Sequence, residues 1–213
     1  MSRAGFDVAL GSRSVTIAEL TVAEIVKCAR GAGLGSGVDA SMAMKQLGLQ
    51  LALRMVDGAP VGFNDLDGAR WDAKFSIGET LSLMSVFDQV HDATQEALDA
   101  LLTAATVTEG PDGTTTTVKL GGQAIAFRRL GFGAFRAAMA MGDKEPTPAA
   151  KDYVSGLATV RRSIATIDGA EPTWNDDLSA WPWSPKDTAL LMGVSRALNG
   201  LDAAARPTVV AST

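Results

Sequence analysis

Residues that could take part in catalysis or metal binding are few and scattered in this chain. His91 is the only histidine and Cys28 the only cysteine among its 213 residues. A histidine-based metal site needs several ligands at short spacing, and thiol catalysis needs a base beside the thiolate. The sequence offers neither, so we expect His91 on a solvated helix face and Cys28 as a small buried residue. We therefore predict no catalytic residue, no metal site and no cofactor.

Two further segments have only part of the pattern of a ligand site. The stretch from Gly31 to Gly37 is glycine-rich, but a predicted helix precedes it and no Lys-Ser or Lys-Thr pair follows, as a phosphate-binding loop requires. Asp65, Asp67 and Asp72 are close together but lack the terminal glutamate of a calcium-binding loop. We interpret the first segment as a connection between helices and the aspartates as turn and cap residues.

Aromatic side chains concentrate in two irregular stretches, each of which precedes a predicted helix. They are Phe63, Trp71 and Phe75 in the first stretch and Trp174, Trp181 and Trp183 in the second. These residues are the candidate partner-binding site, because aromatic rings anchor interfaces by burying large rigid surfaces. The alternative is that they close the hydrophobic cores. In that case Phe63 and Trp174 are expected in equivalent, largely buried places.

The segments around these aromatic residues occur twice. Asp57-Gly58-Ala59 returns as Asp168-Gly169-Ala170, 111 positions later, and matching blocks lie before and after it at offsets of 110 and 108. Self-similarity at a nearly constant offset indicates repeated structural units. We predict two units, residues 1–105 and 106–213, that arose by tandem duplication. Duplication of a self-associating unit would give a roughly two-fold, isologous contact between them.

Each unit is predicted to contain a β-hairpin followed by three helices. In the first unit we expect a hairpin over 6–20 and helices over 21–30, 39–55 and 76–101. The pairs Thr21 with Glu24 and Ser76 with Glu79 have capping-box spacing, and Ser184 begins the last helix of the second unit in the same way. The predicted fold class is α+β, mainly α-helical.

Charge and hydropathy argue against two classes of partner. The net charge is −5, and residues 1–105 hold 8 Lys and Arg against 13 Asp and Glu. Because nucleic-acid affinity is largely cationic, we predict no nucleic-acid partner. No window approaches the roughly 20 apolar residues of a membrane helix, so we predict no membrane partner. The single cysteine and the lack of a signal-peptide pattern favour an intracellular protein.

Two segments carry a resemblance to known proteins. The first is Val8-x-Leu10-Gly11 with Val15 and Ile17, followed by Leu20-Thr21-Val22-Ala23-Glu24. The second runs from Arg161 to Leu198, with Ile167-Asp168-Gly169, Trp174 and Leu190-Leu191-Met192. The order of elements resembles the tail assembly chaperones of tailed phages. The second segment is also similar to the baseplate hub proteins of contractile tails.

This resemblance implies a non-enzymatic phage tail or baseplate assembly protein that binds other phage tail or baseplate proteins. It places the protein in the host cytoplasm during assembly, or in the virion tail if the protein stays in the particle as a structural baseplate component. The resemblance leaves the oligomeric state open. An alternative of another class is a small-ligand or enzymatic module with a site between the two repeats, since pockets often form at domain interfaces.

Overall fold

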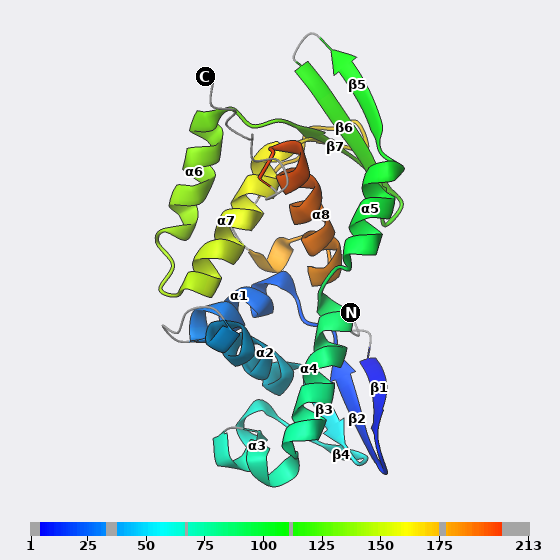
Figure 1. The fold of residues 1–213 in the computed structure, drawn as a ribbon, viewed down its shortest axis with the longest axis vertical. Helices are drawn as coiled ribbons and strands as arrows, with labels where there is room; N and C mark the ends of the chain where they lie inside the picture. Colours follow the sequence, from blue (N-terminus) through cyan, green and yellow to red (C-terminus); the bar gives the residue numbers. More distant parts are fainter. Residues whose placement is uncertain (1–4, 33–37, 67, 111–112, 175–177, 202–213) are drawn as a thin grey trace, which may run out of the picture.

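The chain forms one four-stranded antiparallel sheet in each half, with helices packed between and beside the sheets (Figure 1). The computed structural model describes residues 5–32, 38–66, 68–110, 113–174 and 178–201. The predicted α+β class with mainly helical content is confirmed. No helix within the described ranges is long and apolar enough to cross a membrane.

The first half begins with a hairpin and ends with a long helix. Its elements are β1 (Gly5–Leu10), β2 (Arg13–Ala18), α1 (Val22–Gly31), α2 (Val38–Ala52), β3 (Leu53–Val56), β4 (Ala59–Pro60), the 3-10 helix η1 (Phe63–Asp65), α3 (Gly68–Lys74) and α4 (Ile77–His91). The sheet order is β1-β2-β3-β4. Both predicted capping boxes are confirmed, at Thr21 for α1 and at Ser76 for α4. They satisfy backbone N–H groups that a helix start would otherwise leave without acceptors.

The second half repeats the order of the main elements with one strand added in front, but β4 and α3 have no counterparts among its described residues. Its elements are β5 (Thr106–Gly110), β6 (Gly113–Leu120), β7 (Gln123–Arg128), α6 (Phe132–Gly142), α7 (Pro148–Ser163), β8 (Ile164–Ile167), the 3-10 helix η2 (Leu178–Ala180) and α8 (Pro185–Leu198). The sheet order is β5-β6-β7-β8. A linking helix, α5 (Gln95–Thr103), connects α4 to β5. The counterparts of β1, β2, β3 and α4 are therefore β6, β7, β8 and α8.

Two predicted helices have the wrong extent. The helix expected over 39–55 ends at Ala52, because Leu53–Val56 pair with β2 as strand β3. The helix expected over 76–101 is two helices, since α4 ends at His91 and Thr94 caps the start of α5 by accepting a hydrogen bond from the N–H of Ala97 at 3.2 Å. Threonine favours such cap positions because its hydroxyl bonds the backbone locally.

Strand pairing is repeated in detail between the halves. The register of β2 against β3 shifts between Thr16 and Ile17, and that of β7 against β8 shifts between Ala126 and Phe127, 110 residues later. A bulge is a local irregularity that two unrelated hairpins have no reason to share at the same position. The repeated register supports the predicted duplication, which remains a prediction about ancestry.

The Asp-Gly turn that revealed the repeat has the same conformation in both halves. Asp57 and Asp168 have positive φ angles of 52° and 51°. Their carboxylates accept hydrogen bonds from the N–H of Ser14 at 3.0 Å and of Ala124 at 2.8 Å. Aspartate tolerates the left-handed region better than most residues because its short side chain can bond the backbone. The carboxylate thus ties each turn to the neighbouring hairpin.

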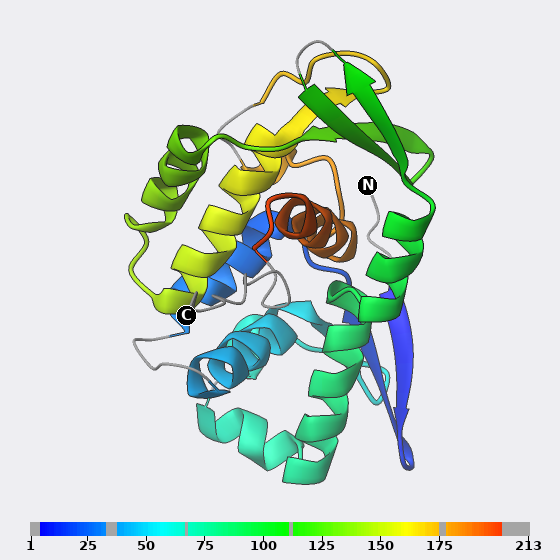
Figure 2. The ribbon, with the colours of Figure 1, turned by 45° about the horizontal axis from the view of Figure 1, so that its top comes forward.

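The two halves share the helix α1 between two hydrophobic cores. The first core contains Leu10, Val15, Ile17, Leu20, Ile25, Cys28, Leu49, Leu53, Leu66, Trp71, Phe75, Leu83 and Phe87. The second core contains Val22, Val26, Val118, Ile125, Phe127, Leu157, Val160, Ile164, Trp181, Trp183, Leu191 and Val194. Two different faces of α1 therefore lie in different cores, and α1 runs beside α7 of the second half (Figure 2). Tyr153 of α7 packs against both cores, so the halves are not packed independently.

The contact between the halves is not two-fold. Helix α1 packs against α7, but α6, the counterpart of α1, has no comparable contact with α2, the counterpart of α7, among the described residues. An isologous interface requires such reciprocal pairs, so this contact is heterologous, or head to tail. The expectation of a two-fold contact is therefore wrong. The second half follows the first along the molecule, because α8 begins beside the end of α4 (Figure 1).

Candidate functional site

Four of the six predicted partner-binding aromatics lie in the hydrophobic cores. Trp71 and Phe75 are buried in the first core, and Trp181 and Trp183 are buried in the second. These four rings are not accessible to a partner in this structure, which corrects their assignment to a docking surface. Their burial agrees with the alternative interpretation, in which the aromatics close the cores.

Trp71 and Trp181 occupy equivalent places, whereas the expected pair of Phe63 and Trp174 does not. The indole N–H of Trp71 donates to Thr80 Oγ1 at 2.9 Å, and that of Trp181 donates to Thr188 Oγ1 at 2.8 Å. Phe63 is 41% exposed, so the prediction that it is buried is wrong. A buried indole needs an acceptor for its N–H, and a threonine in the following helix supplies it in both halves.

Trp174 is half-buried on the outside of a tryptophan cluster. Its ring stacks on Trp181 with centroids 5.7 Å apart and lies 6.0 Å from Trp183. The guanidinium of Arg161 lies 5.7 Å from the Trp174 ring centroid and 5.2 Å from that of Trp181. Of the six predicted residues, only Phe63 and Trp174 therefore retain surface that a partner could contact.

A cleft between the two halves is a site that the structure reveals and that the sequence did not indicate. It has a volume of ≈ 560 Å³ and is lined by Ile25, Ser41, Met44, Lys45, Phe87, Asp88, His91, Asp92, Gln95, Leu98, Tyr153, Pro185, Ala189, Met192, Gly193 and Arg196. These residues come from α1, α2, α4, α5, α7 and α8 and from the turn after α4. No single stretch of sequence could show that they converge.

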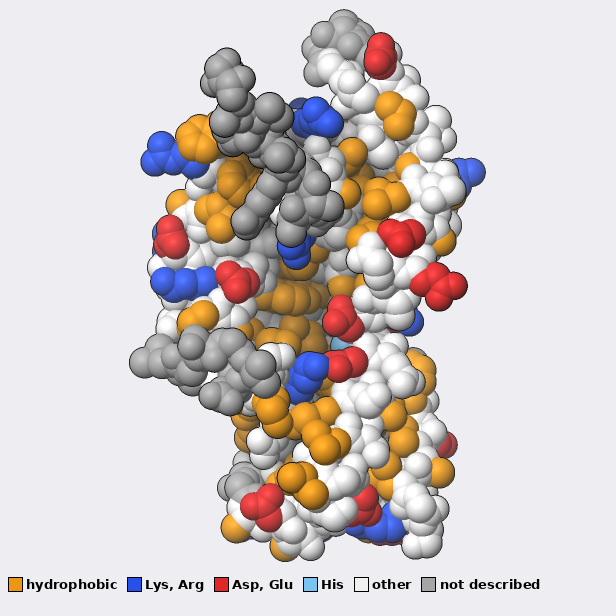
Figure 3. Space-filling model, viewed as in Figure 1, with side chains coloured by type: hydrophobic (Ala, Val, Ile, Leu, Met, Phe, Trp, Pro, Cys, Tyr) orange, Lys and Arg blue, Asp and Glu red, His pale blue; other side chains and the backbone are white. Residues whose placement is uncertain are grey.

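The cleft continues into a second depression along α6, α7 and α8. This depression has a volume of ≈ 460 Å³ and shares Met192 and Arg196 with the cleft. Phe135, Met139 and Leu201 add apolar surface to it. Figure 3 shows the hollow on the front face, with hydrophobic side chains on its floor. The two depressions thus adjoin along α8 and share part of their walls.

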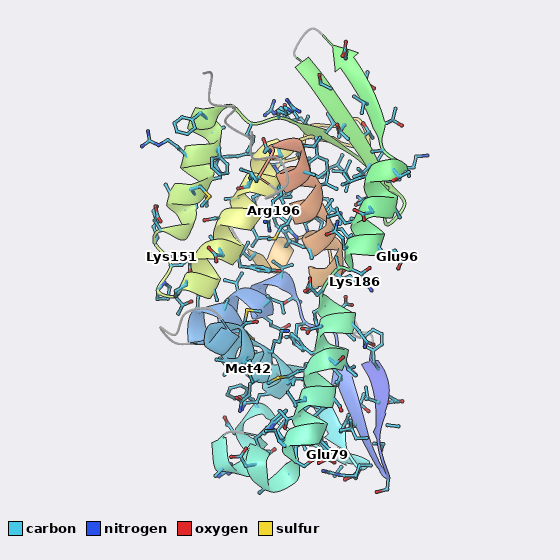
Figure 4. All side chains as sticks on the ribbon, in the orientation of Figure 1. Met42, Glu79, Glu96, Lys151, Lys186 and Arg196 are labelled. Atoms are coloured by element: carbon cyan, nitrogen blue, oxygen red, sulfur yellow. The ribbon has the colours of Figure 1, made fainter. Side chains whose placement is uncertain are left out.

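Charged groups stand at the rim of the cleft. The Nζ of Lys45 on α2 lies 2.6 Å from a carboxylate oxygen of Asp88 on α4, and both side chains are partly exposed. Asp92 and Arg196 also line the cleft, and Figure 4 shows Arg196 on α8. Exposed ion pairs of this kind contribute about 0–1 kcal/mol to stability. We therefore expect these charges to orient a bound partner more than they stabilise the fold.

His91 is buried at the base of this cleft, which corrects its assignment to a solvated helix face. Only 6% of its surface is exposed, and its ring stacks on Phe87 with centroids 4.2 Å apart. Its Nε2 accepts a hydrogen bond from the N–H of Leu20 at 2.8 Å, so Nδ1 carries the proton and donates to the carbonyl of Phe87 at 2.9 Å. Both ring nitrogens are engaged by the backbone, and the neutral ring serves as a structural link. The sequence signal for its burial was its position four residues after Phe87, which places the two rings on the same apolar face of the helix.

Stability is expected to fall between pH 7 and pH 5.5, in part because of His91. Burial lowers the pKa of the folded His91 below its ordinary value of 6.5. In this window the unfolded chain binds a proton that the folded chain does not, so the stabilisation is present above the unfolded pKa and is lost below it. His91→Gln keeps an acceptor for Leu20 and should show a shallower decline in denaturant unfolding. An equal decline in both proteins would contradict this role.

The other candidates from the sequence are Cys28, the acidic residues and the glycine-rich stretch. Cys28 is buried, as predicted, and burial raises the pKa of its thiol to about 11. No group of three or more His, Cys, Asp or Glu residues in the described ranges could hold a metal ion. The glycine-rich stretch falls on residues 33–37, and Asp67 is likewise outside the described residues, so both interpretations stay predictions.

Comparisons with known proteins do not assign a function to this cleft. A scan against protein-family models, a search of curated proteins and a search of solved structures each find no match to the chain.

Proposed function

We propose that this protein is a non-enzymatic assembly protein of phage tails or baseplates, and that it binds an apolar segment of another tail protein in the cleft between its halves. The observation that supports this proposal is the cleft itself. It is open, its floor is apolar, and both halves contribute to it. Apolar grooves of this kind accept partner helices or extended segments through a few anchor side chains.

The composition of the floor suits a partner with several apolar anchors. Met44, Phe87, Leu98, Tyr153 and Met192 line it. Methionine is flexible and polarisable, so it can repack around anchors of different shape. A chaperone that shields assembly-prone segments of more than one partner would benefit from such a surface.

The charge of the chain indicates what should flank those anchors. The first half holds 8 Lys and Arg against 13 Asp and Glu, and Asp88 and Asp92 stand at the rim of the cleft. The rim also carries Lys45 and Arg196, so it is the acidic balance of the first half that would attract a partner with basic residues next to its apolar anchors. Association should then slow as salt is raised, because screening weakens exposed charge interactions.

The proposal that the partner is a phage tail protein rests on the resemblance of the hairpin and helix pattern to tail assembly chaperones. Action in the host cytoplasm during assembly follows from the same resemblance. Retention in the virion as a baseplate component is the alternative within this proposal. A small-ligand or enzymatic module is the alternative outside it, since a cleft of ≈ 560 Å³ also falls in the size range of small-molecule sites.

Filling the cleft is expected to weaken partner binding at least tenfold. Ala189→Arg places a long charged side chain among apolar neighbours on the cleft wall. An apolar anchor of the partner that packs there would remove water from this charge, which is unfavourable. The protein would be co-expressed with the tail genes next to its own, and the amount of tail protein retained in a pull-down would be measured. Ala100→Arg, on the exposed side of α5, is the matched control and should retain the partner.

Two results would contradict the proposal. The first is that Ala189→Arg and Ala100→Arg retain the same amount of tail protein. The second is that the wild-type chain retains no tail or baseplate protein while a small molecule raises its melting temperature, an effect that Ala189→Arg abolishes. That second result would favour the small-ligand alternative at the same cleft.

A further inference from the structure

Helix α6 is covered on one side only. It stands at the edge of the molecule beside α7 (Figure 1, Figure 2), and among the described elements it packs extensively only against α7. Ala138 and Gly142 are its only buried residues, and they lie four residues apart on the side that faces α7. Away from that side, Phe132 is 76% exposed and Met139 is 42% exposed. The helix therefore presents large apolar side chains to the outside.

In the first half the equivalent face is fully covered. At the offset of 110, Phe132 and Met139 correspond to Val22 and Ala29 of α1, which are 1% and 0% exposed. Val22 belongs to the second core, and the hydroxyl of Thr147 donates to the carbonyl of Ala29 at 2.6 Å. The covering elements are α7, η2 and α8 of the second half. The face that is buried between the halves in α1 is thus open in α6.

The helices of the first half that correspond to α7 and α8 also carry open apolar surface. These counterparts are α2 and α4. Met42 on α2, shown in Figure 4, is 45% exposed. Ile77 and Leu81, one turn apart on α4, are 82% and 54% exposed. Large apolar side chains therefore remain uncovered on both helices.

In the second half the counterparts of these three residues lie where the halves meet. At offsets of 111 and 108 along the repeat they are Tyr153, Pro185 and Ala189. Tyr153 packs against both cores, and Pro185 and Ala189 line the cleft between the halves. The two surfaces that meet inside the chain therefore each occur a second time, uncovered. One is on α6 of the second half, and the other is on α2 and α4 of the first.

We infer that copies of this chain associate head to tail, with α6 of one copy packed against α2 and α4 of the next, as α1 packs against α7 and α8 within a copy. A heterologous contact can be continued in this way because it leaves one matching face open at each end. The exposed apolar side chains of the two faces would remove each other from water. Arg136, one turn after Phe132, would approach a first half that holds 8 Lys and Arg against 13 Asp and Glu. This association does not use the cleft, so it stands or fails apart from the proposed function.

A carboxylate placed on either open face tests the association. Phe132→Asp and Leu81→Asp change exposed positions, so the thermal unfolding of each variant should match that of the wild type. Analytical ultracentrifugation would be carried to about 1 mM, where even a contact of millimolar Kd is populated. The wild type should self-associate, and either variant should associate at least about tenfold more weakly, because the contact would bury an unpaired charge. Val107→Asp, at a 63% exposed position on β5 outside both faces, is the control and should associate as the wild type does.

A mixture of the two variants distinguishes a head-to-tail contact from a two-fold one. Chains with Phe132→Asp keep the face on α2 and α4, and chains with Leu81→Asp keep the face on α6. The mixture should form a complex of one chain of each kind and stop there, because both faces that stay open carry the substitution. A two-fold contact through α6 would be weakened by Phe132→Asp alone and would not be restored by mixing. That result, a wild type that stays monomeric throughout the series, or an equal loss with Val107→Asp would overturn the inference.

Discussion

Replacement of Trp71 or Trp181 by alanine is expected to destabilise the protein by about 3–5 kcal/mol each, the usual cost of deleting a large buried aromatic ring. Trp71 is 1% exposed, and its ring lies 4.7 Å from that of Phe75. Trp181 packs between Trp174 and Trp183. Each deletion leaves a cavity in one core and removes the indole N–H that donates to the hydroxyl of Thr80 or Thr188. Chemical denaturation measures both losses.

Phe63→Ala is the control for these two substitutions. Phe63 begins η1, keeps 41% of its surface exposed and belongs to neither core, so its removal should change stability by less than about 1 kcal/mol. If Phe63→Ala costs as much as Trp71→Ala, then Phe63 and not Trp71 is the aromatic that closes the first core. The same result would contradict the equivalence of Trp71 and Trp181.

Gly142→Ala is expected to destabilise the protein by about 1–3 kcal/mol, the range of overpacked sites. A Cβ atom at Gly142, at the end of α6, would overlap the Oγ of Ser155 and the carbonyl oxygen of Lys151 on α7. Because one of these is a backbone atom, a side-chain rotation cannot relieve the overlap. Helices α6 and α7 would have to move apart at this point, and they would lose packing contacts.

Gly133→Ala, in the same helix, should have the opposite sign. A Cβ atom there meets nothing within 4 Å. Alanine is a better helix former than glycine by about 1 kcal/mol in a helix interior, so stability should rise by up to that amount. Thermal unfolding of the two variants checks the pair. If Gly142→Ala loses no stability, the approach of α6 to α7 does not limit position 142.

Local patterns in the sequence predicted the elements whose causes are local. The capping boxes at Thr21 and Ser76 and the Ser184 start of α8 are all confirmed, because each rests on hydrogen bonds within four residues. Strand β3 was not predicted, because Leu53–Val56 continue the apolar pattern of α2 and become a strand only by pairing with β2. Tertiary pairing overrides local propensity at such points.

The site was less predictable than the fold, and α1 shows why. Val22 and Val26 lie in the second core while Ile25 and Cys28 lie in the first. The sequence shows that both faces of this helix are apolar, but it does not show that they belong to different cores. The cleft arises from that arrangement, because it lies where α1 and its neighbours bring the halves together. The aromatic stretches were visible in the sequence, yet most of their rings serve the cores.

Site-specific photo-crosslinking tests the central claim most directly. A photoreactive residue at Ser41, which is exposed on α2 and lines the cleft, would be compared with one at Ser82, which is exposed on α4 outside it. During co-expression with the neighbouring tail genes, irradiation should join a tail or baseplate protein to position 41 and not to position 82. Cross-linking of a tail protein at position 82 alone, or of none at either position, would contradict the assignment of the cleft as the partner-binding site.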